Sequence, residues 1–521
     1  MGMLKPRYFI YLVSLLALSA CQKPMEFLPY EWGDTFINPK IEVEGNGYHK
    51  SSSFGSLTLI NKSGEYQVNS YKEIVSSGDY RYVSPSLGDL KALIIPINFL
   101  DSDTSKNERQ RILIQNAFLG NEKTTNFESL TSYYYKSSYG QLKIDGFVSE
   151  FYNYPLASTE INGNNSSSSK TIAGSAIKWF YESHPHFDIT PFDKDGDGYL
   201  DLVYFVYNKE VDTSSNNVSP LWWAFVDSLK KNESYNTNNP YLSSFCWIST
   251  SFLEGKNNKV ETHALIHETG HMFGLLDYYN TYSSMNYQPT GYVDMMDRNL
   301  GDHTALSKMF LNWTTPYVVN ESTEITLKPF NSSGDLLLIP TSNGWNNTPY
   351  DEYLILEYYT PYGLNKYDAG NKYYYTNKDG KRGVFTFLNR NGLKVYHVNA
   401  RLAYFQSKIN RNLIAYQNDP EAQNKLDGYS SYCVDLAYSN SILDSRANLD
   451  PVLYHLLEVE GNNTFINNNP ATNNTLWKSG DTFGVDTFTN IVLDDNADIN
   501  YTFEVTNMNS LGVTIRVTKK I

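Results

Sequence analysis

The stretch from His267 to Asp277 contains residue types, at spacings, that can bind a metal ion and use it for chemistry. His267 and His271 are four residues apart, so on an α-helix their imidazoles project from one face on successive turns and can reach the same ion. Glu268 is the next residue round the helix, where it can take a proton from a water at the metal without binding the metal itself. The stretch therefore predicts a catalytic zinc site with Glu268 as general base.

A third zinc ligand is expected a few residues after the second histidine. Gly274 can adopt a backbone conformation that residues with a Cβ avoid, which lets the chain leave the helix and turn back. Asp277 would then return toward His267 and His271 as the third ligand, leaving a fourth position open for water. An acidic residue elsewhere in the chain is the alternative third ligand.

An aspartate-rich turn before the zinc motif has the oxygen spacing of a calcium-binding loop. Its expected donors are Asp193, Asp195, Asp197, Asp201 and the main-chain carbonyl of Tyr199. Gly196 permits the sharp turn, but Tyr204 occupies the position where a complete helix-loop-helix calcium site has an acidic residue. Because the aspartates repel one another without a cation, Ca²⁺ is favoured over the alternative of a solvated acidic turn.

The N-terminus predicts export and attachment to a membrane. Residues 1–20 have the pattern of a signal peptide, since Lys5 and Arg7 precede an apolar run that is too short to span a bilayer. The junction at residues 18–21, Leu-Ser-Ala-Cys, resembles the lipobox of bacterial lipoproteins, so Cys21 is expected to carry the lipid. We therefore expect a lipoprotein of the bacterial cell envelope, at the outer membrane or cell surface.

The composition and charge of the chain argue against one class of partner. The chain has 521 residues and a formal net charge of −14, and it contains no basic run, which argues against nucleic acid as a partner. Its length predicts two or three domains. Two cysteines remain after Cys21, and Cys246 and Cys433 could form a disulfide or stay as two buried thiols.

The pattern of apolar residues divides the rest of the chain into three regions. Residues 21–90 contain short alternating runs and are expected to form a β-rich leader or pro-region. Residues 91–318 alternate strand and helix patterns, including a helix over 107–119, and contain the zinc motif. Residues 319–521 contain repeated alternating runs and predict a β-rich, sandwich-like domain. The run at 245–250 is one candidate for an edge strand that pairs with an extended substrate.

The order of these motifs resembles the immune inhibitor A family of secreted bacterial metallopeptidases. The segment 132–142, the aspartate-rich turn, the 267–277 motif and Asp294-Met295-Met296 carry the resemblance, which extends over about residues 91–517. It implies an α+β fold, in which a metzincin-like catalytic domain with a mixed sheet and an active-site helix precedes a β-rich C-terminal module. It also implies bound calcium and a methionine turn beneath the metal, with Met296 the better candidate and Met295 the second.

These observations predict a zinc-dependent endopeptidase that hydrolyses peptide bonds of extracellular proteins, with one catalytic Zn²⁺ and structural Ca²⁺. Protein or peptide substrates and a membrane, through the lipid anchor, are the expected partners. Tyr278, Tyr279 and His303 are the candidate donors to the oxyanion. The alternative is an inactive surface lipoprotein whose β-rich module binds host protein or glycan, but a site that only stiffens the fold would not need Glu268.

Overall fold

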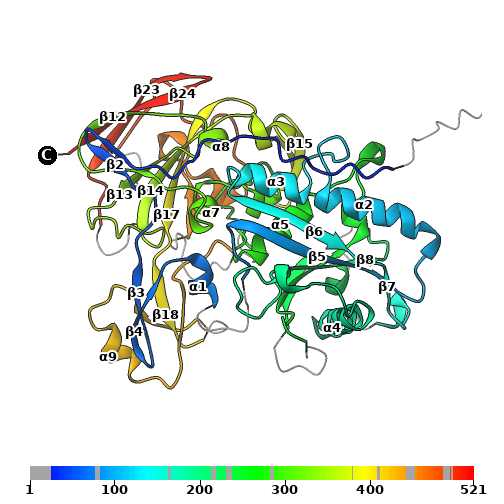
Figure 1. Cartoon of the computed structure of the whole chain (residues 1–521). Helices are drawn as coiled ribbons and strands as arrows, with labels where there is room; N and C mark the ends of the chain where they lie inside the picture. The colour runs from blue at the N-terminus through cyan, green and yellow to red at the C-terminus, as the bar shows by residue number, and fades with distance from the viewer. Residues whose placement is uncertain are drawn as a thin grey trace, which may run out of the picture.

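A six-stranded sheet has helices on both faces in the computed structural model, and the helix of the 267–277 motif packs on one of these faces (Figure 1). The strand order is β6-β5-β8-β10-β9, and β7 pairs with the end of β5. The strands are β5 (Gly88–Asn98), β6 (Leu142–Val148), β7 (Tyr152–Asn153), β8 (Leu202–Asn208), β9 (Phe225–Ser228) and β10 (Ser244–Ser249). The structure describes residues 25–520 apart from 77–82, 162–165, 213–218, 230–237, 282–286, 378, 408–410, 442–451, 485–492 and 494–496.

Alternation along the central strand β5 explains the layering. Ala92 and Ile94 belong to the core that the sheet shares with α2, α3 and α5, whereas Leu93 and Ile95 pack with α4 on the opposite face. A parallel strand covered by helices on both faces has to be apolar on both sides, which is the pattern of this run. The helices are α2 (Asn107–Leu119), α3 (Leu130–Ser137), α4 (Ser166–Ser183), α5 (His263–Met272), α6 (Met295–Arg298) and α7 (Ala305–Phe310).

The edge of this sheet is not where the sequence suggested it. The candidate run 245–250 forms β10, which lies between β8 and β9 and is therefore an interior strand. The edge strand on this side is the short β9, which runs antiparallel to β10, whereas β5, β6, β7, β8 and β10 pair in parallel. β10 is buried along its whole length, whereas β9 contains Asp227 and Ser228 and is partly exposed, which fits its place at the edge.

A second sheet joins the two halves of the molecule. Its order is β1-β2-β11-β13-β14-β17-β21. Tyr353 and Ile355 of β14 pack into the core around α5, while Leu354 and Leu356 face a separate core that this sheet shares with a four-stranded sheet. The strands of the large sheet are β1 (Val43–Gly45), β2 (Tyr48–Lys50), β11 (Tyr317–Val319), β13 (Leu336–Pro340), β14 (Glu352–Tyr359), β17 (Gly392–Asn399) and β21 (Tyr454–Leu456).

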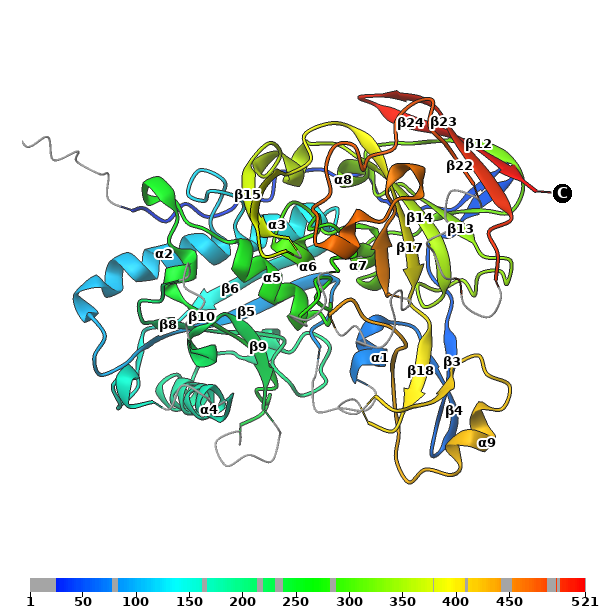
Figure 2. The ribbon, with the colours of Figure 1, turned by 180° about the vertical axis from the view of Figure 1, so that it is seen from behind.

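The outer four-stranded sheet has the order β12-β24-β23-β22 and completes a sandwich with the large sheet (Figure 2). Smaller sheets lie around this sandwich, and a short helix, α8 (Phe330–Ser333), contacts β14. The outer strands are β12 (Thr323–Leu327), β22 (Thr482–Phe483), β23 (Tyr501–Asn509) and β24 (Gly512–Lys519). The smaller sheets are β15 (Lys372–Thr376) with β16 (Arg382–Thr386), and β19 (Leu413–Tyr416) with β18 (Leu402–Phe405) and β20 (Cys433–Leu436).

The N-terminal segment is built into both halves of the molecule. Its strand β2 pairs with β11 of the large sheet. Its hairpin of β3 (Leu57–Asn61) and β4 (Gly64–Val68) lies beside β18 (Figure 1), where the Ile60 N–H donates to the Tyr404 hydroxyl oxygen at 2.9 Å. The helix α1 (Tyr71–Ser76) then reaches the end of α5, and its Tyr71 ring stacks on Phe310 with centroids 4.5 Å apart.

The expected domain limits can be compared with these elements. Residues 48–50, inside the expected leader or pro-region, pair with β11 of the large sheet, and the expected limit at 318 falls inside β11. Pairing between strands that are distant in the sequence places both segments in the large sheet. The local pattern of apolar residues carries no information about such pairing. The predicted α+β class is confirmed, since the strands of one mixed sheet alternate with helices in one half of the molecule and strands dominate the other half.

Two further expectations concern the cysteines and the membrane. Cys246 lies in β10 and Cys433 in β20; both thiols are buried and neither is in a disulfide. Within the described residues, no helix has the length and apolar character needed to cross a bilayer. The signal peptide at 1–20 and the lipidation site at Cys21 lie outside the described residues.

Candidate metal centre

The two histidines of the motif converge on one carboxylate. His267 and His271 lie on successive turns of α5, and their rings are 4.8 Å apart and nearly perpendicular. Their Nε2 atoms lie 3.1 Å and 3.2 Å from the same Oδ1 atom of Asp277. The ligand atoms of the three side chains are all within 4.8 Å of one another, so the structure brings together the three predicted zinc ligands.

Main-chain carbonyls hold both imidazoles in this orientation. The Nδ1 atom of His267 lies 2.8 Å from the carbonyl oxygen of Met295, and Nδ1 of His271 lies 2.8 Å from that of Leu275. When each Nδ1 donates to its carbonyl, the lone pair of the neutral ring is on Nε2. Both side chains are therefore set to present Nε2 to a metal ion.

The turn after α5 returns Asp277 to the histidines. Gly274 has φ +91°, in the left-handed region, and its N–H donates to the carbonyl of His271 at 3.0 Å. A Cβ at this position would lie 3.2 Å from atoms of both Tyr71 and Val83 of the N-terminal segment. Glycine is thus required by the backbone conformation and by the close packing, as its place in the motif predicted.

Electrostatics favour a cation at this position. Burial of the Asp277 carboxyl group raises its pKa, but the hydrogen bonds with His267 and His271 outweigh this effect and hold the pKa below its usual value. Burial also lowers the pKa of His267, yet the hydrogen bond with Asp277 and the charges of Glu268 and Asp277 raise it to about 9. The Asp277 carboxylate is therefore ionised and paired with the imidazole of His267, whose proton a divalent metal would displace on binding.

Glu268 lies beside the three ligands and is partly exposed. Its negative charge contributes to the raised pKa of His267 and also to that of the Tyr279 phenol. Tyr279 is itself half-buried; burial is the main cause of its raised pKa, and the charge of Asp277 and a hydrogen bond with it add to the effect. Carboxylate, imidazole and phenol groups thus surround the position that the ligands define.

The segment expected to form a methionine turn, Asp294 to Met296, lies against the back of α5. Its methionines begin α6, and the carboxylate of Asp294 caps this helix by accepting the N–H of Met296 at 2.6 Å. The same carboxylate accepts the N–H of Thr304 at 3.0 Å, and the Met296 carbonyl accepts the N–H of Tyr278 at 2.8 Å. Burial raises the pKa of Asp294 to about 7 against the effect of these hydrogen bonds.

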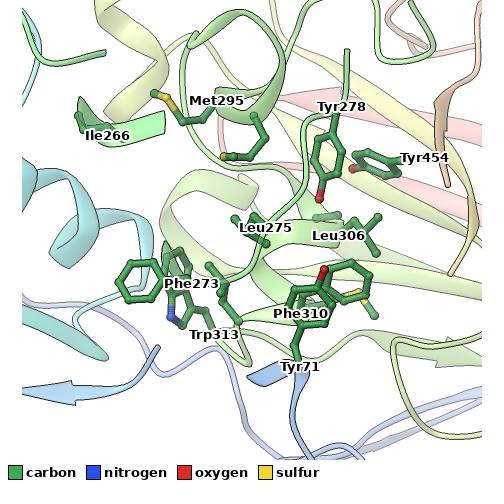
Figure 3. Packing of buried hydrophobic residues seen from close by; sticks show 14 of the residues in the cluster. Tyr71, Ile266, Phe273, Leu275, Tyr278, Met295, Leu306, Phe310, Trp313 and Tyr454 are labelled. Carbon is green, nitrogen blue, oxygen red and sulfur yellow. The ribbon is translucent and has the colours of Figure 1, made fainter. Parts of the chain in front are cut away.

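Both methionines of this turn have a role. Met296 is buried and its sulfur packs on Gly270, where a Cβ would lie only 2.4 Å from Sδ. Met295 supplies the carbonyl that orients His267. Figure 3 shows Met295, Ile266, Leu275 and Tyr278 in the apolar packing around the motif.

The three candidate oxyanion donors are separated by their surroundings. The hydroxyl of Tyr278 is buried and lies 2.8 Å from Oγ of Ser307, beside the Tyr454 ring (Figure 3). His303 is 1% exposed, lies behind α5 near Gly270, and has a pKa well below its usual value because it is buried. Tyr279 alone of the three is partly exposed beside the ligands, with its ring 6.4 Å from that of His267.

The aspartate-rich turn forms a second group of carboxylates. The side chains of Asp193, Asp195 and Asp197 come within 4.8 Å of one another, and Gly196 has the expected positive φ, of +70°. The predicted donor Asp201 is not part of this group, because its Oδ2 accepts the N–H of Lys194 at 2.7 Å. Burial raises the pKa of Asp201 to about 7.

Two details of this turn were not foreseen. Tyr199, whose carbonyl was the fifth expected donor, gives its N–H to Asp197 at 3.0 Å and pairs with Tyr241 in a β-bridge. The ammonium of Lys72, from α1, forms ion pairs with Asp195 and with Asp197, the latter at 3.1 Å. No sequence signal links Lys72 to a turn so distant along the chain. A calcium ion would have to replace this ammonium.

The donor set of the first group fits zinc, and that of the second fits calcium less completely. Two imidazoles and one carboxylate, with both Nδ1 atoms hydrogen-bonded, are a donor set of the kind that catalytic zinc sites use. Three carboxylates are oxygen donors of the kind that calcium prefers, but they are fewer than its usual six to eight. Comparison of the sequence with protein-family models gives no match, and comparison with curated proteins gives none either.

Substituting Gly270 with alanine tests the packing between the zinc helix and the methionine turn. Alanine favours a helix more than glycine does, but the new methyl group would overlap the Met296 sulfur, so we expect Gly270→Ala to lose about 1–3 kcal/mol of stability. Denaturant unfolding measures this loss. Gly428→Ala is the matched control, because the nearest atom to its Cβ is 3.6 Å away. Equal or greater stability of Gly270→Ala would contradict the packing argument.

Proposed function

We propose that the protein is a zinc-dependent endopeptidase that cleaves extracellular proteins. The observation that carries the proposal is the convergence of His267 and His271 Nε2 on the Asp277 carboxylate, with Glu268 on the same helix beside them. A bound zinc ion would supply a Lewis acid and lower the pKa of water at the site. A site that only stabilises the fold needs no adjacent carboxylate of this kind.

The chain's own residues supply the remaining chemistry. Glu268 is placed to accept the proton of the attacking water and to deliver it to the leaving amine. The Tyr279 phenol, with its pKa raised, stays protonated at neutral pH and can donate a hydrogen bond to the oxyanion of the scissile group. Met295 and Leu275 fix the two imidazoles through their carbonyls, so that the ligands do not have to reorganise during turnover.

The sheet offers a means of holding an extended substrate. The strand β9 is antiparallel and lies at the edge, and it contacts α5. A peptide added to this edge would make main-chain hydrogen bonds, which are independent of side-chain sequence. Such pairing suits an endopeptidase that acts on unfolded segments of proteins.

The family and the second metal are part of the same proposal. Parallel strands with one antiparallel edge strand, followed by the zinc helix and a methionine turn, support a metzincin-like catalytic domain and membership of the immune inhibitor A family. Asp193, Asp195 and Asp197 are proposed to bind structural Ca²⁺. Lipidation of Cys21 would place the enzyme at the surface of the cell envelope, where extracellular proteins are accessible.

The deciding experiment is hydrolysis of an unfolded protein, such as reduced casein, by the purified protein with and without a zinc chelator. Glu268→Gln removes the base and should lower kcat by about 100-fold or more while zinc content is retained. Glu210→Gln, at a side chain that is 97% exposed, is the matched control and should be as active as the wild type. Equal cleavage by the wild type and Glu268→Gln would refute the role of Glu268.

Adjacent tyrosines allow a controlled test of the oxyanion donor. Tyr279→Phe should lower kcat by about 10-fold to 100-fold with KM nearly unchanged, because the hydrogen bond forms only as negative charge develops. Tyr278→Phe loses a bond to Ser307 away from the ligands, so its kcat should stay close to that of the wild type. Steady-state kinetics with zinc content measured on the same samples would distinguish the two, and an unchanged kcat in Tyr279→Phe would exclude it as the donor.

Calcium should stabilise the fold through the aspartate-rich turn. With zinc held constant, added Ca²⁺ is expected to raise the unfolding temperature by a few degrees, or about 1–3 kcal/mol at saturation. The double variant Asp195→Asn, Asp197→Asn should not respond, since it loses two of the three clustered carboxylates. A wild-type protein that is indifferent to Ca²⁺ would mean that Lys72 already satisfies the turn.

A further inference from the structure

The hairpin β15–β16 forms a two-stranded sheet of its own and has two different faces. On the inner face, Phe385 is buried and stacks on Tyr292 of the loop that leads to the methionine turn, with ring centroids 5.7 Å apart. The Tyr373 hydroxyl donates to Asp368 at 2.5 Å, which fixes the first strand. The hairpin is therefore attached rigidly to the catalytic part by one face.

The outer face of the hairpin carries cations and exposed apolar groups. Alternation along the strands places on this face Lys372, Tyr374, Thr376, Arg382, Val384 and Thr386. Tyr374 and Val384 are opposite one another and are 74% and 54% exposed. None of these residues is acidic, although the whole chain has a formal net charge of −14. The face is thus locally basic and amphipathic on an acidic protein.

The position of the chain's N-terminal end relates this face to a membrane. The described chain starts at Met25, and the following residues pair with the end of α2, where Pro29 forms a bridge with Gly120. Glu122, just beyond α2, lies 4.0 Å from Lys366, a few residues before β15. Figures 1 and 2 both show the N-terminal end and β15 on the same upper side of the molecule, away from β3, β4 and α9 (Ala422–Leu426).

The short spacer limits how far this side can lie from the lipid. Cys21 and Met25 are four residues apart in the sequence. A fully extended chain spans at most about 3.6 Å per residue, so the spacer reaches about 14 Å. If Cys21 carries the lipid, as proposed above, the side of the molecule at Met25 has to lie against the membrane.

We infer that the outer face of the β15–β16 hairpin is a contact surface for an anionic phospholipid membrane. Lysine and arginine near a negatively charged leaflet are attracted by its surface potential, and tyrosine favours the interface between headgroups and acyl chains. The contact would add a second attachment to the membrane beside the lipid anchor. It would also orient the catalytic part, because the inner face of the hairpin packs on Tyr292 near the methionine turn.

The test uses the mature chain, residues 21–521, with Cys21→Ser, so that no lipid contributes to binding. Its partition is measured by sedimentation with vesicles of phosphatidylglycerol and phosphatidylethanolamine, and with phosphatidylcholine vesicles, at low and high salt. We expect binding to the anionic vesicles that salt weakens. The double variants Lys372→Glu, Arg382→Glu and Tyr374→Ser, Val384→Ser should each bind at least about tenfold more weakly.

A control with the same change of charge separates this surface from net charge. Lys178→Glu, Lys425→Glu alters exposed lysines on α4 and α9 and should bind as the wild type does. Absence of binding by the wild type, equal binding to neutral vesicles, or an unchanged hairpin variant would overturn the inference. Tighter binding to polyglutamate than to anionic vesicles would overturn it too, and would assign the face to an acidic protein.

The membrane contact rests on the proposed function only through the lipid anchor, and the two can fail separately. The mass of the mature protein purified from membranes reports whether Cys21 is lipidated, and casein hydrolysis by the hairpin variants reports peptidase activity. Loss of vesicle binding with retained hydrolysis supports the membrane contact, because the fold and the metal centre are then intact. Loss of both in the hairpin variants would instead show that the hairpin is needed for the fold, and would overturn the assignment.

Discussion

Two hydrogen bonds from imidazole to the main chain determine the geometry of the candidate metal centre. The carbonyls of Met295 and Leu275 accept from Nδ1 of His267 and His271, which points both Nε2 atoms at Asp277. A main-chain carbonyl can hold an imidazole this closely only when its own segment is fixed. The geometry of the site therefore depends on the contacts that fix the two segments carrying these carbonyls.

The segment with Met295 is fixed by a buried carboxylate. Asp294 accepts from Met296 and Thr304 without an opposing cation among these contacts, and burial raises its pKa to about 7. Hydrogen bonds to main-chain N–H groups offset part of the cost of burying the charge. The bond from the Tyr278 amide to the Met296 carbonyl ties this turn to the residue after Asp277, so ligand and support move together.

The local chemistry of the site was predictable from the sequence, whereas its long-range supports were not. His267, Glu268, His271 and Gly274 have the positions that their spacing implied, and Asp277 meets both histidines because the turn at Gly274 is short. Helical periodicity and turn chemistry are properties of neighbouring residues, so a single sequence contains them. The same reasoning explains why α2 begins and ends at the residues that its spacing predicts.

The features that could not be predicted from the sequence depend on contacts between distant segments of the chain. No local pattern showed that Phe225–Ser228 would form a strand outside β10, or linked β2 to β11. Lys72 and Gly270 are of this kind as well, since one pairs with carboxylates from another region and the other matters only because Met296 approaches it. Lysine and glycine are common residues, and the roles of these two are evident only from the residues that they contact.

The N-terminal segment shows how such contacts bear on the metal centre. Tyr71 and Val83 lie against Gly274, at the turn that returns Asp277, and the N–H of Ser84 donates to the Met272 carbonyl at the end of α5 at 3.0 Å. These contacts satisfy a helix-terminal carbonyl and fill the space beside a glycine that has no side chain of its own. Without this segment the end of α5 and the Asp277 turn would lose their packing, so the segment belongs to the support of the site.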